Sequence, residues 1–169
     1  MMIVVATPAT EREFAPYGRL LRMAPRERAD LDSPRLVFTD GDGWLDCYTA
    51  EPLLMRNGSL GVTLGGPAPF ATNRMERHLV TEEALFCMAD PVVLVVAAPT
   101  AESAPRVENL RAFVLEPGMV AVLQTGTWHD ACRGIGKPTH YYWMATVGDG
   151  SGSSWVEVVG GPARVTATP

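Results

Sequence analysis

The stretch LRAFVLEPGMVAVLQ, residues 110–124, decides the fold class of this chain. It holds two short runs rich in Val, Leu and Ala, one on each side of Glu116-Pro117-Gly118. β-Branched and aromatic side chains pack well on a pleated, half-buried surface, and a Pro-Gly pair interrupts regular structure. We therefore predict strands at residues 110–115 and 119–124, joined by a turn.

The same pattern recurs along the chain, where 16 Gly and 14 Pro residues separate short apolar runs. Further strands are predicted at residues 36–39, 60–64, 84–88, 92–98 and 141–147. Residues 10–21 alone indicate a helix, because Thr10 and Glu13 form a capping-box pattern; the helix is expected to end near Pro16-Tyr17-Gly18. The chain is thus predicted to be all-β with one short N-terminal helix.

Length and charge restrict the class of protein. A chain of 169 residues with 47% hydrophobic residues can bury one substantial core, so residues 1–169 are expected to form a single domain. The net charge is −5 and the basic residues are scattered, which argues against a nucleic-acid partner. The N-terminus has no basic leader and no apolar run reaches membrane-spanning length, so we expect a cytoplasmic protein without a membrane partner.

The three cysteines do not indicate a disulfide framework. Cys47, Cys87 and Cys132 are odd in number, widely spaced and without a Cys-x-x-Cys pair. A zinc site built from thiolates is not indicated either, and we expect buried or partly buried reduced thiols.

Ionisable residues gather in the segment ERHLVTEE, residues 76–83. On a strand, Glu76 and His78 project from one face because side chains alternate. Glu83 can return to that face only if the chain turns between Val80 and Glu82.

A second segment, GMVAVLQTGTWH at residues 118–129, joins an apolar strand to a turn and a histidine. Gly118, Gly126 and His129 fit the spacing Gly, seven residues, Gly, two residues, His. The turn at Gly126 is expected to bring His129 opposite the strand that carries Glu76 and His78.

Together the two segments resemble the paired motifs of the cupin superfamily. The first has the family form His-x-His, three or four residues, Glu, with Glu76 in place of the first histidine. The second matches except that Gln124 stands where proline is usual. The resemblance implies a cupin-type antiparallel β-barrel, or jelly roll, with Glu76, His78, Glu83 and His129 facing one cavity.

The four side chains are also a chemically sensible set. Two imidazoles and two carboxylates supply mixed nitrogen and oxygen ligands, which suit Zn, Mn, Ni or Fe. Glu76, His78, Glu83 and His129 are therefore the predicted ligands of a divalent metal, and no organic cofactor is expected. The alternative is that His78 and His129 are core histidines satisfied by local hydrogen bonds.

A closer resemblance is carried by four short pieces in order: FAPYG at 14–18, MERH at 75–78, LRAF at 110–113 and TWH at 127–129. This series resembles the ureidoglycolate lyase family, a cupin family of purine catabolism. The chain departs from the family pattern at Leu79, where proline is usual, and at Glu83, where glutamine is usual. Asp130 replaces the second histidine of a Trp-His-His triplet.

The resemblance implies a lyase that cleaves a carbinolamine C–N bond of ureidoglycolate to release urea and glyoxylate. His129 or Glu83 is then expected to act as base and His78 to orient substrate or bind metal. The expected partner is a small carboxylated substrate, clamped by Arg56 or Arg111, and a homodimer is expected. Two alternatives stay open: another metal-dependent cupin enzyme, either isomerase or oxygenase, and a non-catalytic small-molecule-binding cupin.

Overall fold

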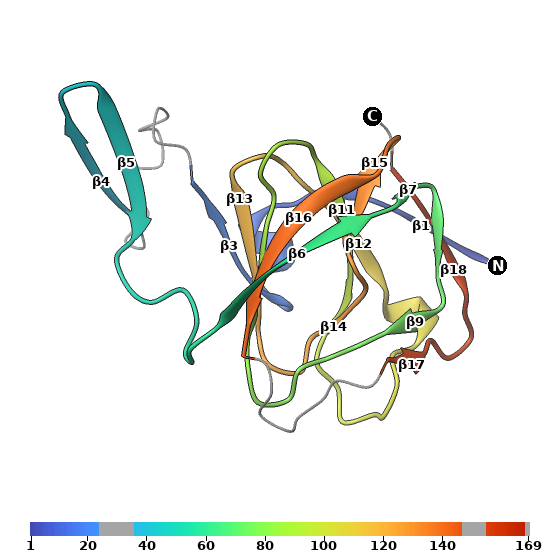
Figure 1. Ribbon diagram of the computed structural model, residues 1–169. Coiled ribbons are helices and arrows are strands. Elements are labelled where there is room, and N and C mark those ends of the chain that lie inside the picture. The colour runs from blue at the N-terminus through green and yellow to red at the C-terminus, as the bar shows by residue number, and fades with distance from the viewer. Residues whose placement is uncertain (24–35, 147–154, 168–169) are drawn as a thin grey trace.

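The computed structural model describes residues 1–23, 36–146 and 155–167, and short strands dominate it (Figure 1). Within these ranges one α-helix, α1 (Glu11–Phe14), and one 3₁₀ turn (Val107–Asn109) accompany the strands. The strands are β1 (Met2–Val5), β2 (Thr7–Pro8), β3 (Gly18–Arg22), β4 (Leu36–Gly41), β5 (Trp44–Thr49), β6 (Ser59–Gly65), β7 (Pro67–Ala68), β8 (Phe70–Thr72), β9 (Arg74–Met75), β10 (Glu83–Phe86), β11 (Val92–Ala97), β12 (Arg111–Leu115), β13 (Met119–Leu123), β14 (Trp128–His129), β15 (Arg133–Ile135), β16 (Thr139–Ala145), β17 (Val156–Glu157) and β18 (Ala163–Thr166).

The N-terminal helix begins where the capping pattern predicts and ends early. The hydroxyl of Thr10 accepts a hydrogen bond of 3.2 Å from the Glu13 amide, which satisfies one free donor of the first turn. The helix ends at Phe14, slightly before the expected end near residues 16–18, and Gly18 to Arg22, the rest of the segment that looked helical, pair with β13 as strand β3. In the described ranges, no helix has the length and apolar character needed to cross a membrane.

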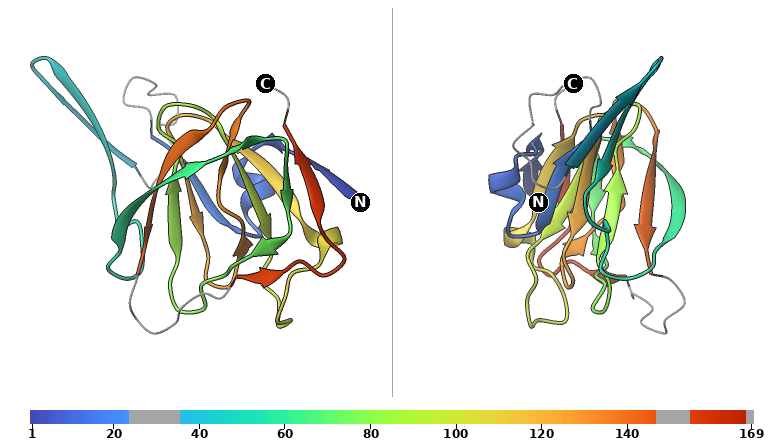
Figure 2. Two further views of the ribbon diagram at one scale, coloured as in Figure 1. Left: turned by 45° about the vertical axis from the view of Figure 1, so that its right-hand side comes forward. Right: turned by 90° about the vertical axis from the view of Figure 1, so that its left-hand side faces the viewer.

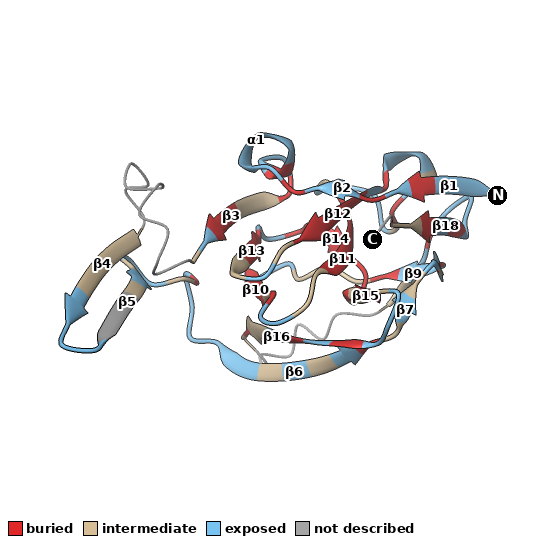
Figure 3. Ribbon diagram, turned by 90° about the horizontal axis from the view of Figure 1, so that it is seen from above, coloured by how far each residue is buried: buried red, intermediate tan, exposed pale blue. Residues whose placement is uncertain are grey.

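The seven predicted strands are present as β4, β6, β10, β11, β12, β13 and β16, with small differences at their ends. Residue 147, at the end of the last prediction, lies outside the described residues. Two larger sheets carry most of them, in the orders β3-β13-β10-β16-β6 and β2-β12-β11-β15-β7. Buried residues gather between these sheets and on their inner strands (Figure 3).

Strand β11 lies in the sheet between the other large sheet and the small sheet β1-β18-β8, so the fold has three layers. Its side chains alternate between two separate apolar clusters, so both faces of the strand are buried. Leu94 and Val96 pack toward the other large sheet, whereas Val93 and Val95 pack toward the small sheet β1-β18-β8. A continuous apolar run is the expected sequence of a strand that is covered on both faces.

The architecture is an all-β fold of cupin type, as the paired motifs imply. Most pairings are antiparallel, but the short pairs β1–β18, β2–β12 and β7–β15 are parallel, which the sequence analysis did not predict. The thiols of Cys87 and Cys132 are buried and that of Cys47 is partly buried, and none of the three forms a disulfide.

Two features lie at the outer side of the fold. The β4–β5 hairpin extends away from the body of the molecule (Figure 2). Strand β6 forms one edge of its sheet, and Leu60, Val62 and Leu64 are exposed along one of its faces. Apolar strand edges are where barrels associate, and the homodimer stays a prediction.

Gly65, the last residue of β6, and Gly66, which follows it, offer a test of how β6 packs against residue 132. A Cβ at Gly65 would overlap the carbonyl oxygen of Cys132, whereas a Cβ at Gly66 would have its nearest heavy atom 3.8 Å away. We expect Gly65→Ala to destabilise the protein by about 1–3 kcal/mol, as overpacking does, and Gly66→Ala to leave it within about 0.5 kcal/mol. Thermal denaturation checks this, and equal melting temperatures for the two variants would contradict the packing of β6 against residue 132.

Candidate active site

The chain segments around Glu76 and His129 are held together by their backbones. Residue 76 follows β9, and residue 129 ends β14. The Glu76 amide donates to the His129 carbonyl at 3.0 Å, and the His129 amide donates back at 2.9 Å. Side chains of directly opposed residues project to the same side of such a pair. Both functional groups therefore enter the same cavity.

The third and fourth residues reach this place after a change of direction. The chain bends at residues 79–80, slightly before the predicted turn, and Glu83 then opens β10. There Glu83 pairs with Leu123 on one side and Ala145 on the other. Its position in the middle of the sheet gives the carboxylate a rigid support.

All four predicted side chains converge. Oε2 of Glu83 lies 2.8 Å from Nε2 of His129 and 3.1 Å from Nε2 of His78. Oε1 of Glu76 lies 3.8 Å from Nε2 of His129, and the two imidazole rings are 5.3 Å apart. The four residues line a cavity of about 340 Å³.

The ring of His129 is oriented by its own strand. Its Nδ1 lies 3.2 Å from the carbonyl oxygen of Thr127, and because a carbonyl only accepts, Nδ1 carries the hydrogen. Nε2 therefore faces the cluster. This buried atom is close to Glu83, yet no described residue lies in the direction of a proper hydrogen bond to it.

Burial and charge act in opposite directions on the central pair. Burial raises the pKa of Glu83, but the charge and close contact of His129 and the hydrogen bond with His78 outweigh it and lower that pKa to about 2. Burial lowers the pKa of His129, but the Glu83 and Glu76 carboxylates outweigh it, and the net direction is upward. Without another cation in the cavity, the two groups thus form a buried ion pair.

Three of the four residues fit a metal ion. One ligand atom each from Glu76, His78 and His129 lie within 4.8 Å of one another. The poorly satisfied Nε2 of His129 is a free lone-pair position in its neutral form, and its Nδ1–H to carbonyl bond is the usual support of a ligating histidine. Glu83 lies beside this trio, in contact with both imidazoles, and its predicted role as a fourth ligand stays a prediction.

The opposite wall of the cavity comes from β16 and β6. Tyr141 and Trp143 alternate inward along β16, and the indole N–H of Trp143 donates to the Thr63 hydroxyl at 3.2 Å. Sequence analysis missed these three residues, although alternation along the predicted strand at 141–147 placed Tyr141 and Trp143 on one face. Among the described residues, the wall includes no Lys or Arg.

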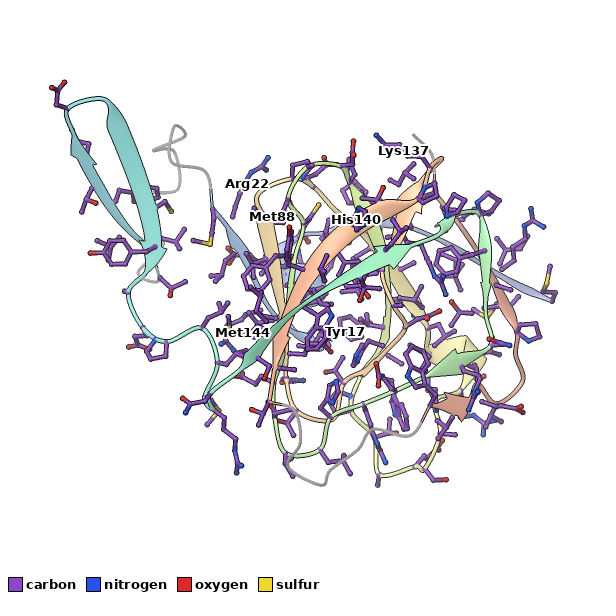
Figure 4. All side chains as sticks on the ribbon, in the orientation of Figure 1. Tyr17, Arg22, Met88, Lys137, His140 and Met144 are labelled. Atoms are coloured by element: carbon purple, nitrogen blue, oxygen red, sulfur yellow. The ribbon has the colours of Figure 1, made fainter. Side chains whose placement is uncertain are left out.

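The expected arginine clamp is wrong for this cavity. Arg56 is exposed on a loop, and Arg111 lines a different cavity. Two other basic residues near the second motif, Lys137 and His140, lie toward the β15–β16 end (Figure 4). Lys137 pairs there with Asp90 at 3.0 Å.

Asp130 lies in the cavity wall, at the position where the family resemblance implies a second histidine. Its carboxylate accepts hydrogen bonds from the Thr72 hydroxyl at 2.9 Å and from the Ala131 amide at 2.8 Å. Burial raises the pKa of Asp130, although these hydrogen bonds and Arg133 act against the rise. The carboxylate is thus engaged with the protein.

A larger cavity of about 650 Å³ lies at the base of the β4–β5 hairpin. Its main charged groups, Arg19 and Glu82, form an ion pair of 2.7 Å. These charges neutralise each other, and no histidine among the described residues lines this cavity. The smaller cavity, which contains Glu76, His78, Glu83 and His129, is therefore the better candidate for the active site.

The buried ion pair predicts a pH window of stability for the metal-free protein. The lowered pKa of Glu83 stabilises the fold above its ordinary value of 4.5, and this is lost as the pH falls toward 2. Because the pKa of His129 is raised, its protonation stabilises the fold fully below pH 6.5, the ordinary pKa of histidine. This stabilisation is lost as the pH rises through the raised pKa. With a chelator present, Glu83→Gln should lower the melting temperature most between about pH 4.5 and 6.5.

The matched control for this prediction is Glu157→Gln, an exposed carboxylate that lines neither the cluster nor its cavity. NMR titration of the His129 ring should also give a lower pKa in Glu83→Gln than in the unmodified protein. A loss of stability that is the same at every pH would show that Glu83 acts by packing alone.

Comparison with known proteins identifies the family of the chain. The sequence model of the family described as ureidoglycolate lyase matches residues 27–160. A protein named ureidoglycolate lyase from Chelativorans sp. (strain BNC1) is 22% identical over 153 residues, which cover 89% of each chain. The matched residues include both motif segments and span most of the sequence, and the chain belongs to the ureidoglycolate lyase family.

Proposed function

We propose that the protein is a lyase that cleaves the carbinolamine C–N bond of ureidoglycolate and releases glyoxylate and urea. The observation that carries the proposal is the compact trio of Glu76, His78 and His129 with Glu83 beside it, in one cavity. Family membership supports the reaction class, and the chemistry of these groups supports the individual steps.

The charge of the cavity supports a divalent cation as part of the enzyme. Ureidoglycolate is an anion, while Glu76, Glu83 and Asp130 are the acidic groups of the wall and the described wall includes no Lys or Arg. A carboxylate substrate entering such a site needs a positive charge to meet it. Glu76, His78 and His129 would hold the cation, and when bound it supplies charge that lowers the pKa of the substrate hydroxyl.

Glu83 is the proposed general base. A carboxylate beside a cation stays ionised near neutral pH, so Glu83 is able to accept the hydroxyl proton of the substrate. The elimination moves one proton from the hydroxyl oxygen to the leaving urea nitrogen. As the carbonyl of glyoxylate forms and the C–N bond breaks, the same carboxyl group can deliver that proton to the nitrogen.

Residues of the opposite wall would position the urea group. The Thr63 hydroxyl, held by the Trp143 indole, and the buried Tyr141 provide polar atoms in an otherwise aromatic surface. Burial raises the pKa of Tyr141 strongly, so its hydroxyl stays protonated and can donate. Aromatic walls with a few fixed polar groups are typical of small-molecule sites.

The test joins metal analysis to a glyoxylate-release assay with ureidoglycolate. We expect about one divalent ion per chain and release of urea and glyoxylate in equal amounts, lost on chelation and recovered on addition of metal. A stoichiometric redox metal without turnover of ureidoglycolate would favour an oxygenase. The absence of both metal and turnover would favour a binding protein, and either result would contradict the proposal.

Replacement of His129 tests the trio directly. His129→Ala should fold, lose bound metal, melt without the stabilisation that added metal provides, and lose at least about 10²-fold in kcat. His129→Gln keeps a hydrogen-bonding amide but loses the imidazole nitrogen, so we expect the same loss. His140→Ala is the control, because His140 is exposed and does not line the cavity. If both His129 variants keep their metal and wild-type rates, His129 only packs.

A further inference from the structure

Trp128, the residue before His129, faces a second cavity, outside the cluster formed by Glu76, His78, Glu83 and His129. Trp128 precedes His129 on β14, and side chains alternate along a strand, so the two project to opposite sides. Trp128 lines a cavity of about 350 Å³ that excludes all four cluster residues. Its wall also includes Tyr17, Arg106, Asn109 and Arg111, from parts of the chain that are far apart in sequence.

Arg111 supplies a positive charge at this cavity. Its guanidinium donates to the backbone carbonyls of Leu110 at 2.8 Å and Glu108 at 3.4 Å, which fix its position without neutralising its charge. Within the described ranges, no carboxylate lies at ion-pair distance from Arg111. Arg106 differs, since it pairs with Glu108 at 2.7 Å, and Glu102 is the one acidic residue of the described wall.

Trp128 forms a buried part of the wall. The residue is 2% exposed, and its indole N–H has no acceptor among the described residues. The Arg77 guanidinium lies 4.2 Å from the centroid of the ring and donates to the carbonyl of Thr100, another wall residue, at 2.8 Å. A second guanidinium therefore lies over this ring in a cation–π contact.

Tyr17 contributes a hydroxyl group to the wall of the same cavity. Its ring packs against Phe14 and Phe113, with centroid distances of 5.9 and 5.6 Å. Burial raises the pKa of Tyr17 and the charge of Arg111 acts to lower it, so the hydroxyl lies within the electrostatic reach of the guanidinium. The aromatic packing holds the hydroxyl as a preorganised donor.

We propose that this second cavity binds a small carboxylate anion, held by the Arg111 guanidinium and the Tyr17 hydroxyl. A guanidinium can donate two parallel hydrogen bonds to a carboxylate, which favours a planar anion. Ala97, Ala98 and Pro105 provide the apolar surface for the rest of a small molecule. The volume of about 350 Å³ is at the lower end of ligand pockets, which suits a ligand of this size. The proposal is independent of the lyase reaction.

Tryptophan indole signals give a direct experiment. The chain has four Trp residues, and three of them line the two cavities: Trp128 lines the second cavity, and Trp143 and Trp155 line the candidate active site. We would titrate ¹⁵N-labelled protein with acetate, with sodium chloride at the same ionic strength as the reference. Trp128→Phe identifies the relevant signal. The Trp128 indole should shift and saturate with a dissociation constant on the order of 1 mM.

Variants of matched charge decide whether Arg111 is responsible. Arg111→Gln should weaken the acetate response of Trp128 by at least about tenfold, because a charge-assisted bidentate contact is lost. Arg164→Gln removes the same charge from an exposed site on β18 and should change nothing. Tyr17→Phe should weaken binding several-fold while keeping the aromatic packing. The proposal is overturned if Trp128 responds equally to acetate and chloride, or if Arg111→Gln and Arg164→Gln bind acetate alike.

Discussion

The pair of backbone hydrogen bonds between Glu76 and His129 is the contact on which the arrangement of both cavities depends. It joins the end of β9 to β14 and sets two segments from distant parts of the chain in one register. Because side chains alternate, this register sends Glu76 and His129 to one side and Arg77 and Trp128 to the other. A slip of one residue would exchange the acidic, imidazole-bearing set for the cationic, aromatic one.

The buried charges of the site impose a second constraint. An ionised carboxylate in a protein interior is stable only when it is paired, hydrogen-bonded or coordinated. Glu83 meets this requirement through two imidazoles, and the central position of β10 between β13 and β16 prevents it from moving to water. The same packing that makes the carboxylate costly to bury keeps its geometry fixed for chemistry.

The departures from the family pattern have different structural consequences. Glu83 stands where the family resemblance implies glutamine, and a carboxylate can accept a proton whereas an amide cannot. Asp130 stands where an imidazole is usual, and its carboxylate is bound by Thr72 and the Ala131 amide. Glu83 lies at the centre of the site, between the two imidazoles, whereas the Asp130 carboxylate is held in the cavity wall by its hydrogen bonds.

Seven of the strands, the first turn of helix and the family could be predicted from the sequence alone, because these depend on local patterns: apolar runs between Gly and Pro, a cap at Thr10, and motif spacing. It also indicated which four ionisable residues to examine together. Tertiary structure alone decided that Gly18 belongs to a strand and that Glu83 lies beside the trio, since both follow from pairing with β13. It likewise moved Arg111 from the expected substrate clamp to another cavity. Local propensity carries no information about which distant strand completes a sheet, and that pairing sets the face on which each side chain lies.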